Sequence, residues 1–427
     1  MKRNVLIVNA SSIYSNNATG ITLRSVFQKL DSKKCLEVAW IGVEKGAHNK
    51  IRTIVPHYGK LSVANVLLKG RRSGINKAIK SNALMPQKRS AKKKLLSDIR
   101  QYLALIPNQC KLYFTTEDMS TIEAFSPDVI YTLGASVNVL QMVDMLSRRF
   151  QIPVVVHHMD NWLHCLQWED NILLSGYKRK LRNYCRRCYE RTTKCIAISN
   201  GMAEDFTKET GVEHVAIMNS INCTEMVCGK LDHPVFRFLY AGGMHLERYK
   251  ALLDFADEVE KYRRANGKEV EFSIYTGQDN IDAFGHFFEG FTSTTLHPAV
   301  SHDQIKGIYE SADALIHVES MSMLNSDFSK YSISTKIPEY LSTGKPVVFY
   351  GPDMLYLFHF LKKNEIALVA KEKQELASII TTLVEQLQIT EAMTERAKEY
   401  AKVHFEICNA VKMMQEVLDQ VQLPDEA

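Results

Sequence analysis

Lys336 and Glu339 are the residues of this 427-residue chain whose types and spacing could best do chemistry. They lie three positions apart in a segment that predicts a helix over 335–342, so their side chains share one helix face. Ser334 or Thr335 can cap the start of that helix. An ammonium and free amides bind phosphate oxygens, and a carboxylate accepts hydrogen bonds from ribose hydroxyls. An ordinary surface ion pair on a capped helix has the same spacing, so the pair alone leaves both interpretations open.

His158 and Asp160 form a second candidate group, directly after a strand predicted at 153–156. A histidine and a carboxylate at the end of a central strand can orient a sugar hydroxyl or move a proton. A hydrogen-bonded structural histidine followed by a helix cap fits the same residues equally well.

A third group, Gly242, Gly243, Arg248 and Lys250, follows a strand predicted at 235–241. The glycines let the backbone approach a ligand closely, and the two cations at a helix start can clamp a diphosphate. The alternative is a glycine turn with solvated cations.

Gly20 ends a polar loop at 11–20 that lies between a buried strand at 4–9 and a helical pattern at 21–30. Such a loop can bind phosphate or sugar at the carboxyl end of a sheet. With one glycine it is no dinucleotide fingerprint, and an ordinary strand-to-helix loop is an equal alternative.

Three short segments, at 334–336, 339–341 and 344–348, resemble the donor-site segment of GT-B glycosyltransferases. The resemblance is strongest to the family 4 group that builds bacterial surface polysaccharides. It extends over nearly the whole chain and is also strong at 195–222. It implies an α/β protein with two Rossmann-like, doubly wound domains that face each other across a cleft.

The alternation of strands and helices also predicts a parallel, doubly wound arrangement. We expect an acceptor-binding domain at 1–222, a linker at 223–234 and a nucleotide-sugar-binding domain at 235–404. By the resemblance, the terminal helix within 405–427 packs back on the first domain.

The resemblance assigns roles to several candidates. Lys336 and Arg248 would bind the diphosphate, with Arg248 in the place of the family's lysine and Gly243 where the family has an arginine. Glu339 would hold the ribose, and His158 would lie near the transferred sugar.

The nucleobase would lie in a loop at 297–301 that includes Val300, close to Tyr275 at the end of a strand predicted at 270–275. Most of the family has a second glutamate eight positions before Glu339, but this chain has Tyr331 there. Asp327 or backbone amides would then recognise the sugar, within a long polar loop predicted at 319–333.

Composition and charge narrow the cellular context. The chain is 45% hydrophobic and 24% charged with a net charge of +5, which is ordinary for a soluble globular protein. Ten Lys or Arg and no acidic residue lie between Lys69 and Lys94, and eight cations lie between Lys178 and Lys194. Nine scattered cysteines and the lack of a long apolar run favour the cytosol. The basic runs are solvated faces or attract an anionic membrane or a diphosphate-linked acceptor.

We therefore expect a glycosyltransferase that moves a sugar from a UDP- or GDP-sugar to a hydroxyl of a glycan or lipid-linked glycan. It would act in cell-surface polysaccharide biosynthesis, with retention at the anomeric carbon and without a metal or other cofactor. We expect it in the cytoplasm, peripheral at the inner face of the cell membrane. One alternative is a nucleotide-sugar epimerase on the same fold. Another is a basic nucleic-acid-binding protein, although neither basic run is interleaved with base-stacking aromatics.

Overall fold

The computed structural model describes residues 1–15, 18–43, 50–59, 91–164, 171–229 and 234–424. The chain divides into two compact units. The first comprises Met1–Met218 and Ile407–Ala427, and the second comprises Asn219–Glu406. The division after Met218 lies shortly before the linker expected at 223–234, and the C-terminal helix belongs to the first unit.

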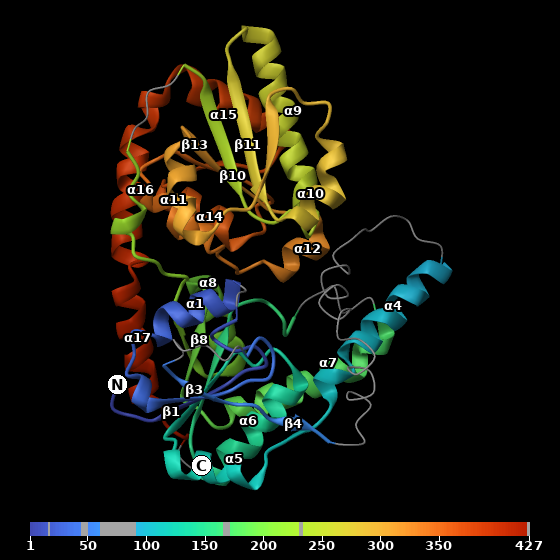
Figure 1. Cartoon of the computed structure of the whole chain (residues 1–427), viewed down its shortest axis with the longest axis vertical. Helices are drawn as coiled ribbons and strands as arrows, with labels where there is room; N and C mark the ends of the chain where they lie inside the picture. Colours follow the sequence, from blue (N-terminus) through green and yellow to red (C-terminus); the bar gives the residue numbers. More distant parts are fainter. Residues whose placement is uncertain (16–17, 44–49, 60–90, 165–170, 230–233, 425–427) are drawn as a thin grey trace. The chain divides into compact units, whose positions relative to one another are not determined.

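The first unit is built on a parallel sheet with the strand order β3-β2-β1-β6-β7-β8-β9 among the described residues (Figure 1). The strands are β1 (Val5–Val8), β2 (Cys35–Val38), β3 (Arg52–Ile54), β6 (Val129–Thr132), β7 (Val154–His158), β8 (Lys194–Ala197) and β9 (Glu213–Ala216). Every residue of β1, β6 and β7 is buried, as expected for apolar runs covered on both faces of a parallel sheet. The strand order reverses between β1 and β6.

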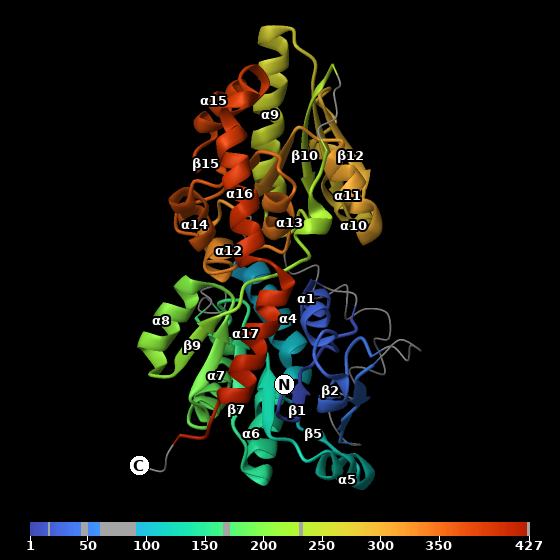
Figure 2. The ribbon, with the colours of Figure 1, turned by 90° about the vertical axis from the view of Figure 1, so that its left-hand side faces the viewer.

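Helices cover this sheet, and short elements complete the unit. They are α1 (Ala18–Phe27), α4 (Ala91–Leu105), α5 (Thr116–Phe125), α6 (Val137–Phe150), α7 (Ser175–Tyr189), α8 (Asn200–Thr210), α17 (Ile407–Gln420), the 3-10 turns η1 (Ser32–Lys34), η2 (Pro107–Gln109) and η4 (Ile172–Leu174), and the antiparallel pair β4 (His57–Tyr58) and β5 (Leu112–Tyr113). Figure 2 shows α17 beside α1. Phe27 of α1 and Leu418 of α17 share one apolar core with Tyr131 of β6. The C-terminal helix α17 therefore packs into the same core as the first strand and the first helix.

The second unit repeats this plan. Its described strands form a parallel sheet in the order β12-β11-β10-β13-β14-β15. They are β10 (Phe236–Ala241), β11 (Val270–Thr276), β12 (Thr294–Pro298), β13 (Ala314–Val318), β14 (Val347–Tyr350) and β15 (Leu368–Ala370). The order reverses between β10 and β13, and the carboxyl ends of strands at such a reversal form the usual ligand crevice of α/β proteins.

The helices of the second unit flank this sheet. They are α9 (Arg248–Asn266), α10 (Gln278–Phe284), α11 (His302–Glu310), α12 (Met323–Phe328), α13 (Lys336–Ser342), α14 (Tyr356–Asn364), α15 (Lys373–Glu385) and α16 (Glu391–His404), with 3-10 turns η5 (Thr224–Met226), η6 (Gly285–Phe287) and η7 (Leu387–Thr390). Phe255 of α9 and Ile380 of α15 pack into one core with Phe238 and Phe272 of the sheet. These two helices therefore share one face of the sheet.

Some expected elements differ in the structure. The long polar loop expected at 319–333 contains α12, because Ser326 donates its hydroxyl to the Ser320 carbonyl and folds the segment back. Strand β12 begins at Thr294, after a turn in which the Phe291 amide donates to the Phe288 carbonyl.

The basic stretch from Lys69 to Lys94 is described only in part. Residues 60–90, and with them most of the stretch from Lys69 to Lys94, lie outside the described residues, whereas Ala91–Leu105 is α4.

Glu260 is a buried carboxylate whose hydrogen bonds should stabilise the second unit. This α9 carboxylate is 4% exposed and accepts bonds from the Ser293 amide at 3.0 Å, the Thr292 hydroxyl at 3.0 Å and Arg264 at 2.9 Å. Burial would raise its pKa, but hydrogen bonds from Ser293 and Thr292 outweigh burial and lower it from 4.5 to about 2. A carboxylate whose pKa is lower in the folded than in the unfolded state stabilises the fold at pH values above its unfolded pKa. This stabilisation is lost as the pH falls through the folded pKa.

We expect Glu260→Gln to destabilise the second unit by about 1–3 kcal/mol at pH 7, because charged hydrogen bonds are replaced by weaker ones. Between about pH 4.5 and 2 the difference from wild type should shrink. Urea unfolding across this range measures it, with the exposed Glu269→Gln as control. A constant difference at all pH values would show that the Glu260 charge is not responsible.

Candidate functional site

Arg248 and Glu319 meet where the strand order of the second sheet reverses. Arg248 begins α9 after the β10 loop, and Glu319 follows β13. Nε of Arg248 donates to Oε2 of Glu319 at 3.0 Å and Nη2 donates to Oε1 at 2.9 Å. The side chains are 17% and 8% exposed. The pair is therefore bidentate and largely buried, a geometry that offsets much of the desolvation of two charges.

Glu319 is ionised in this position. Burial alone would raise its pKa, but Arg248 and a hydrogen bond with His317 lower it to about 2. Nε2 of His317 lies 3.3 Å from Oε1. A Cβ at Gly351 would lie 2.8 Å from Cζ of Phe349 and 3.2 Å from Cβ of Glu319, so the glycine leaves room for both side chains. Glu319 was not among the residues predicted from the sequence, although an acidic residue directly after an apolar segment such as 314–318 was a usable signal.

The glycines after β10 are required by the chain's own side chains. The Tyr240 hydroxyl donates to the Gly243 carbonyl at 2.8 Å. A Cβ at Gly242 would lie 2.7 Å from that hydroxyl oxygen, and a Cβ at Gly243 would lie 2.5 Å from Nδ1 of His245. The two glycines thus allow Tyr240 and His245 to lie close to the backbone, and their predicted contact with a ligand stays a prediction.

The same loop continues with two residues in the left-handed region, Leu246 at φ 57° and Glu247 at φ 63°. Non-glycine residues adopt this conformation only at a cost, so surrounding contacts must hold them. Nδ2 of Asn325 donates to the Leu246 carbonyl at 3.1 Å, and Lys250 pairs with Glu247 at 2.6 Å. Lys250, expected in the diphosphate clamp, is thus engaged at the base of the loop.

Lys336 and Glu339 lie together on α13 as the sequence predicts, with Nζ of Lys336 3.3 Å from Oε2 of Glu339. The pair is not an ordinary surface ion pair, because Glu339 is only 6% exposed. The Tyr309 hydroxyl of α11 donates to the same Oε2 at 2.6 Å. Among the described residues, Oε1 of Glu339 has no hydrogen-bond partner.

Tyr340 joins this helix to the sheet. Its hydroxyl accepts from the Ala241 amide at 3.0 Å, and its ring meets the Tyr309 ring edge-on at 5.2 Å between centroids. Burial raises the pKa of both phenols well above the usual range, so both remain donors. The end of β10, α11 and α13 therefore form one hydrogen-bonded unit around Glu339.

The ends of α13 follow the predicted pattern in part. The Lys336 amide donates to the Ser334 hydroxyl at 3.3 Å, whereas Thr335 makes no side-chain cap. Gly344 takes a φ of 78°, which a glycine adopts readily and which lets the chain leave the helix for β14.

Tyr275 and Val300 border the next strand ends. Tyr275 of β11 stacks on His297 of β12, with centroids 4.6 Å apart and planes inclined by 18°. Val300 is half-buried between β12 and α11, where Ser301 and Gln304 form a capping box.

Position 331 is filled by an aromatic ring. Tyr331 is 8% exposed, and the Lys330 ammonium lies 4.8 Å from its ring centroid. Asp327 lies in α12, half-buried, and its carbonyl accepts from the Lys330 amide.

The structure places His158 in the closed interior of the first unit. It has no exposed surface, its Nε2 lies 2.8 Å from the Tyr189 hydroxyl, and its ring packs edge-on against Phe206. Burial, with His214 and His157 nearby, lowers its pKa well below the usual value. This position fits the structural alternative, because a side chain without exposed surface cannot contact a sugar. Asp160 is half-buried, and its carbonyl accepts from the Trp162 amide.

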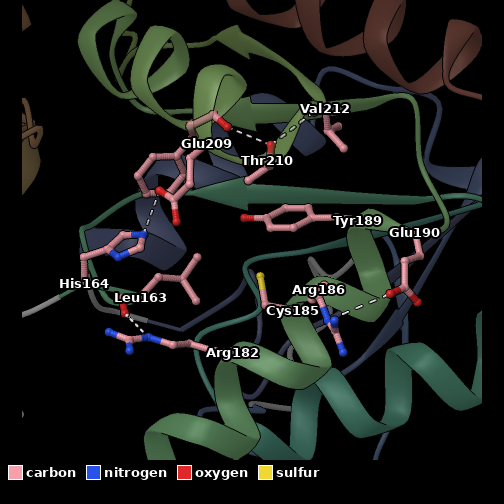
Figure 3. A pocket seen from close by; sticks show the side chains of 11 residues that line it. Leu163, His164, Arg182, Cys185, Arg186, Tyr189, Glu190, Glu209, Thr210 and Val212 are labelled. Carbon is pink, nitrogen blue, oxygen red and sulfur yellow. Dashed lines mark hydrogen bonds and ion pairs between the residues drawn. The ribbon is translucent and has the colours of Figure 1, made fainter.

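A pocket of about 470 Å³ lies between α7 and α8 of the first unit (Figure 3). It is lined by Leu163, His164, Arg182, Cys185, Arg186, Tyr189, Glu190, Phe206, Glu209, Thr210 and Val212. Figure 3 shows the Tyr189 side chain among the lining residues. Its hydroxyl forms a hydrogen bond with His158. His164 pairs with Glu209 at 3.1 Å. His158 thus supports a wall of a pocket whose lining mixes apolar and charged side chains.

Gly20 lies within the first turn of α1 rather than in the preceding loop. A Cβ there would lie 2.3 Å from the Ser15 carbonyl oxygen, so the loop after β1 packs directly on this glycine. Glu37 of β2 is fully buried and fixes the same loop, accepting from the Ser12 hydroxyl at 2.9 Å and the Ile13 amide at 2.7 Å. The sequence analysis did not identify Glu37.

No protein-family model and no curated protein sequence matches the chain. Solved structures are similar over almost its whole length. HepE of Anabaena, in complex with UDP and glucose, is 14% identical with a TM-score of 0.63, over 98% of this chain and 100% of that one. Sucrose-phosphate synthase from Thermosynechococcus elongatus is 10% identical with a TM-score of 0.63, over 98% and 99%.

A third structure is described as trehalose-6-phosphate from E. coli bound with UDP-2-fluoro glucose. It is 10% identical with a TM-score of 0.60, over 97% of this chain and 99% of that one. At these identities the likeness establishes the architecture. Together with the two parallel sheets, each with its own reversal of strand order, it shows that the chain has the α/β fold of the GT-B glycosyltransferases.

Proposed function

We propose that the protein is a glycosyltransferase that moves a sugar from a UDP-sugar to a hydroxyl of a glycan or a lipid-linked glycan. The observation that carries the proposal is the buried Glu339 beside Lys336, held by Tyr309 next to the end of β10 on a GT-B fold. UDP as the nucleotide is supported by HepE, whose structures contain UDP, and UDP-glucose in one complex.

Glu339 is the ribose-binding residue of this proposal. Tyr309 and Lys336 both contact Oε2, which leaves Oε1 to accept a bond from a ribose hydroxyl. The phenol and the ammonium keep the carboxylate in one orientation, so little conformational freedom is lost on binding.

Lys336 is the principal diphosphate ligand of this proposal. Its side chain is 30% exposed and its contact with Glu339 is long for an ion pair. Arg248 is locked on Glu319, so it contributes less net charge and orients the loop after β10. Together the two cations would stabilise the charge that builds on the leaving diphosphate, a role that a metal ion fills elsewhere.

We propose retention at the anomeric carbon and metal-independent catalysis, as the resemblance to family 4 enzymes implies. The same resemblance supports a role in cell-surface polysaccharide biosynthesis, at the cytoplasmic face of the membrane. Among the described residues, no helix has the length and apolarity to cross a bilayer.

The direct test is a thermal-shift screen of nucleotide sugars, followed by NMR of the product with the stabilising donor. A ligand at 100 times its dissociation constant stabilises the protein by about 2.7 kcal/mol. We expect UDP-sugars to stabilise, and the transferred sugar to keep its anomeric configuration. Stabilisation by none of the UDP-sugars would contradict the proposal, and epimerised donor without transfer would favour an epimerase.

Glu339→Gln should weaken UDP binding about ten- to a hundredfold, because an amide oxygen is a weaker acceptor for the ribose hydroxyl than a carboxylate. The amide keeps the size of the side chain and can still accept from Tyr309. Calorimetry measures the loss, with the exposed Glu269→Gln as the matched control. Unchanged UDP affinity in Glu339→Gln would remove the residue from the ribose site.

Lys336→Ala should reduce affinity for UDP much more than affinity for uridine, because the ammonium bonds to phosphate oxygens that the nucleoside lacks. Titration of each variant with both ligands measures the difference, and Lys268→Ala, at an exposed position, is the control. Equal losses for UDP and uridine would place Lys336 elsewhere in the site.

A further inference from the structure

Helix α4 exposes a row of apolar side chains. Leu96, Ile99 and Leu103 are 57%, 37% and 44% exposed, and their spacing places them on one helix face. Tyr102 beside them is 38% exposed. Figure 1 shows α4 extending away from the sheet of the first unit. Its apolar face is therefore not used in the core of the unit.

The opposite face of α4 holds the helix to the unit. Nδ2 of Asn171 donates to the Asp98 carbonyl at 3.2 Å and to Oε1 of Gln101 at 3.1 Å. Asn171 immediately precedes η4, where Ile172 is 85% exposed and Leu173 is 43% exposed. We call these exposed residues the α4–η4 patch: Leu96, Ile99, Tyr102, Leu103, Ile172 and Leu173.

Cations flank the patch. Arg100 of α4 and Arg179 and Lys180 of α7 are exposed, and α7 begins directly after η4. The sequence of α4 contains one acidic residue, Asp98, and that of α7 contains none. An apolar stripe beside Lys and Arg is the pattern of helices that lie in the interface of an anionic bilayer.

We infer that the α4–η4 patch inserts into the surface of an anionic membrane. A second copy of the chain would bring cations against cations, whereas an anionic leaflet attracts them. Nucleic acid fits less well, since five of the six patch residues are aliphatic and do not stack on bases. The inference deepens and rests on the proposed function, because a lipid-linked acceptor presents its hydroxyl at such a surface.

Vesicle co-sedimentation tests the inference, using phosphatidylcholine with and without phosphatidylglycerol over a salt series. We expect wild type to bind the anionic vesicles and to release them as salt rises. Leu96→Glu/Ile172→Glu should weaken this binding about tenfold or more, because two apolar insertions are replaced by charges that the leaflet repels. The control Met354→Glu/Ile389→Glu makes the same charge change at exposed apolar residues of the second unit and should bind as wild type.

Insertion of the α4–η4 patch into the bilayer can be measured separately from binding, by tryptophan fluorescence. Tryptophan placed at position 103 should shift its emission to shorter wavelength with anionic vesicles, whereas tryptophan in Met354→Trp should not. No vesicle binding by wild type at low salt, equal binding by the patch variant, or an unshifted Leu103→Trp spectrum would each overturn the inference. A patch variant that changes the sedimentation coefficient but not vesicle binding would show a subunit interface instead, which also overturns it.

UDP titration of the same variants keeps the two proposals distinguishable. The patch variant should bind UDP as wild type does, because α4 and η4 belong to a different unit from Glu339. Vesicle binding without UDP binding would count against the proposed function alone. UDP binding without vesicle binding would count against the membrane surface alone.

Discussion

The buried ion pair of Arg248 and Glu319 is the constraint on which the strand-end loops of the second unit depend. It ties the loop after β10 to the end of β13, the two strands between which the sheet order reverses. Breaking one side of such a pair would leave an uncompensated buried charge, so both loops are held together. In the loop after β10, Asn325 and Lys250 hold Leu246 and Glu247 in the left-handed conformation. The loops at this reversal of strand order are thus held in place by contacts within the protein.

A second network, around Glu339, uses residues far apart in the chain. Tyr309 reaches Glu339 from 30 positions away, and Tyr340 reaches Ala241 across 99. Because α11 follows the segment that contains Val300, the helix after the expected base-binding loop also orients the expected ribose ligand. In the proposed function, a shift of that loop would move the Tyr309 phenol and with it the Glu339 carboxylate, so that recognition of the base would be coupled to recognition of the ribose.

The sequence predicted what depends on near neighbours. The helix before Gly344 and the strand after it follow from local patterns, and Lys336 and Glu339 share a face by spacing alone. The partners of Glu319 and Glu339 depend on tertiary packing, which no local pattern encodes. His158 illustrates another limit of prediction from sequence. Alternate residues of a strand point to opposite faces, so a position at the end of a strand does not show whether its side chain contacts solvent or helices. At Gly242 and Gly243 the structure adds neighbours that no local pattern indicates, because the side chains of Tyr240 and His245 come close to these two glycines.

Position 331, where most of the resembling family has a glutamate, is occupied in this chain by a buried tyrosine side chain. The Lys330 ammonium lies over the Tyr331 ring, and this aromatic side chain occupies the place of the family's glutamate. Glu319 does not substitute for it, because both of its oxygens accept bonds from Arg248. A carboxylate fully engaged by a guanidinium is a poor acceptor for a sugar hydroxyl, since binding the sugar would first have to break a charged bond. The main-chain amides at the ends of β10 and β13 are already bonded within the unit, Ala241 to the Tyr340 hydroxyl and Glu319 to the Tyr350 carbonyl. In the proposed reaction, recognition of the sugar would therefore rest on Asp327 of α12 or on other main-chain amides.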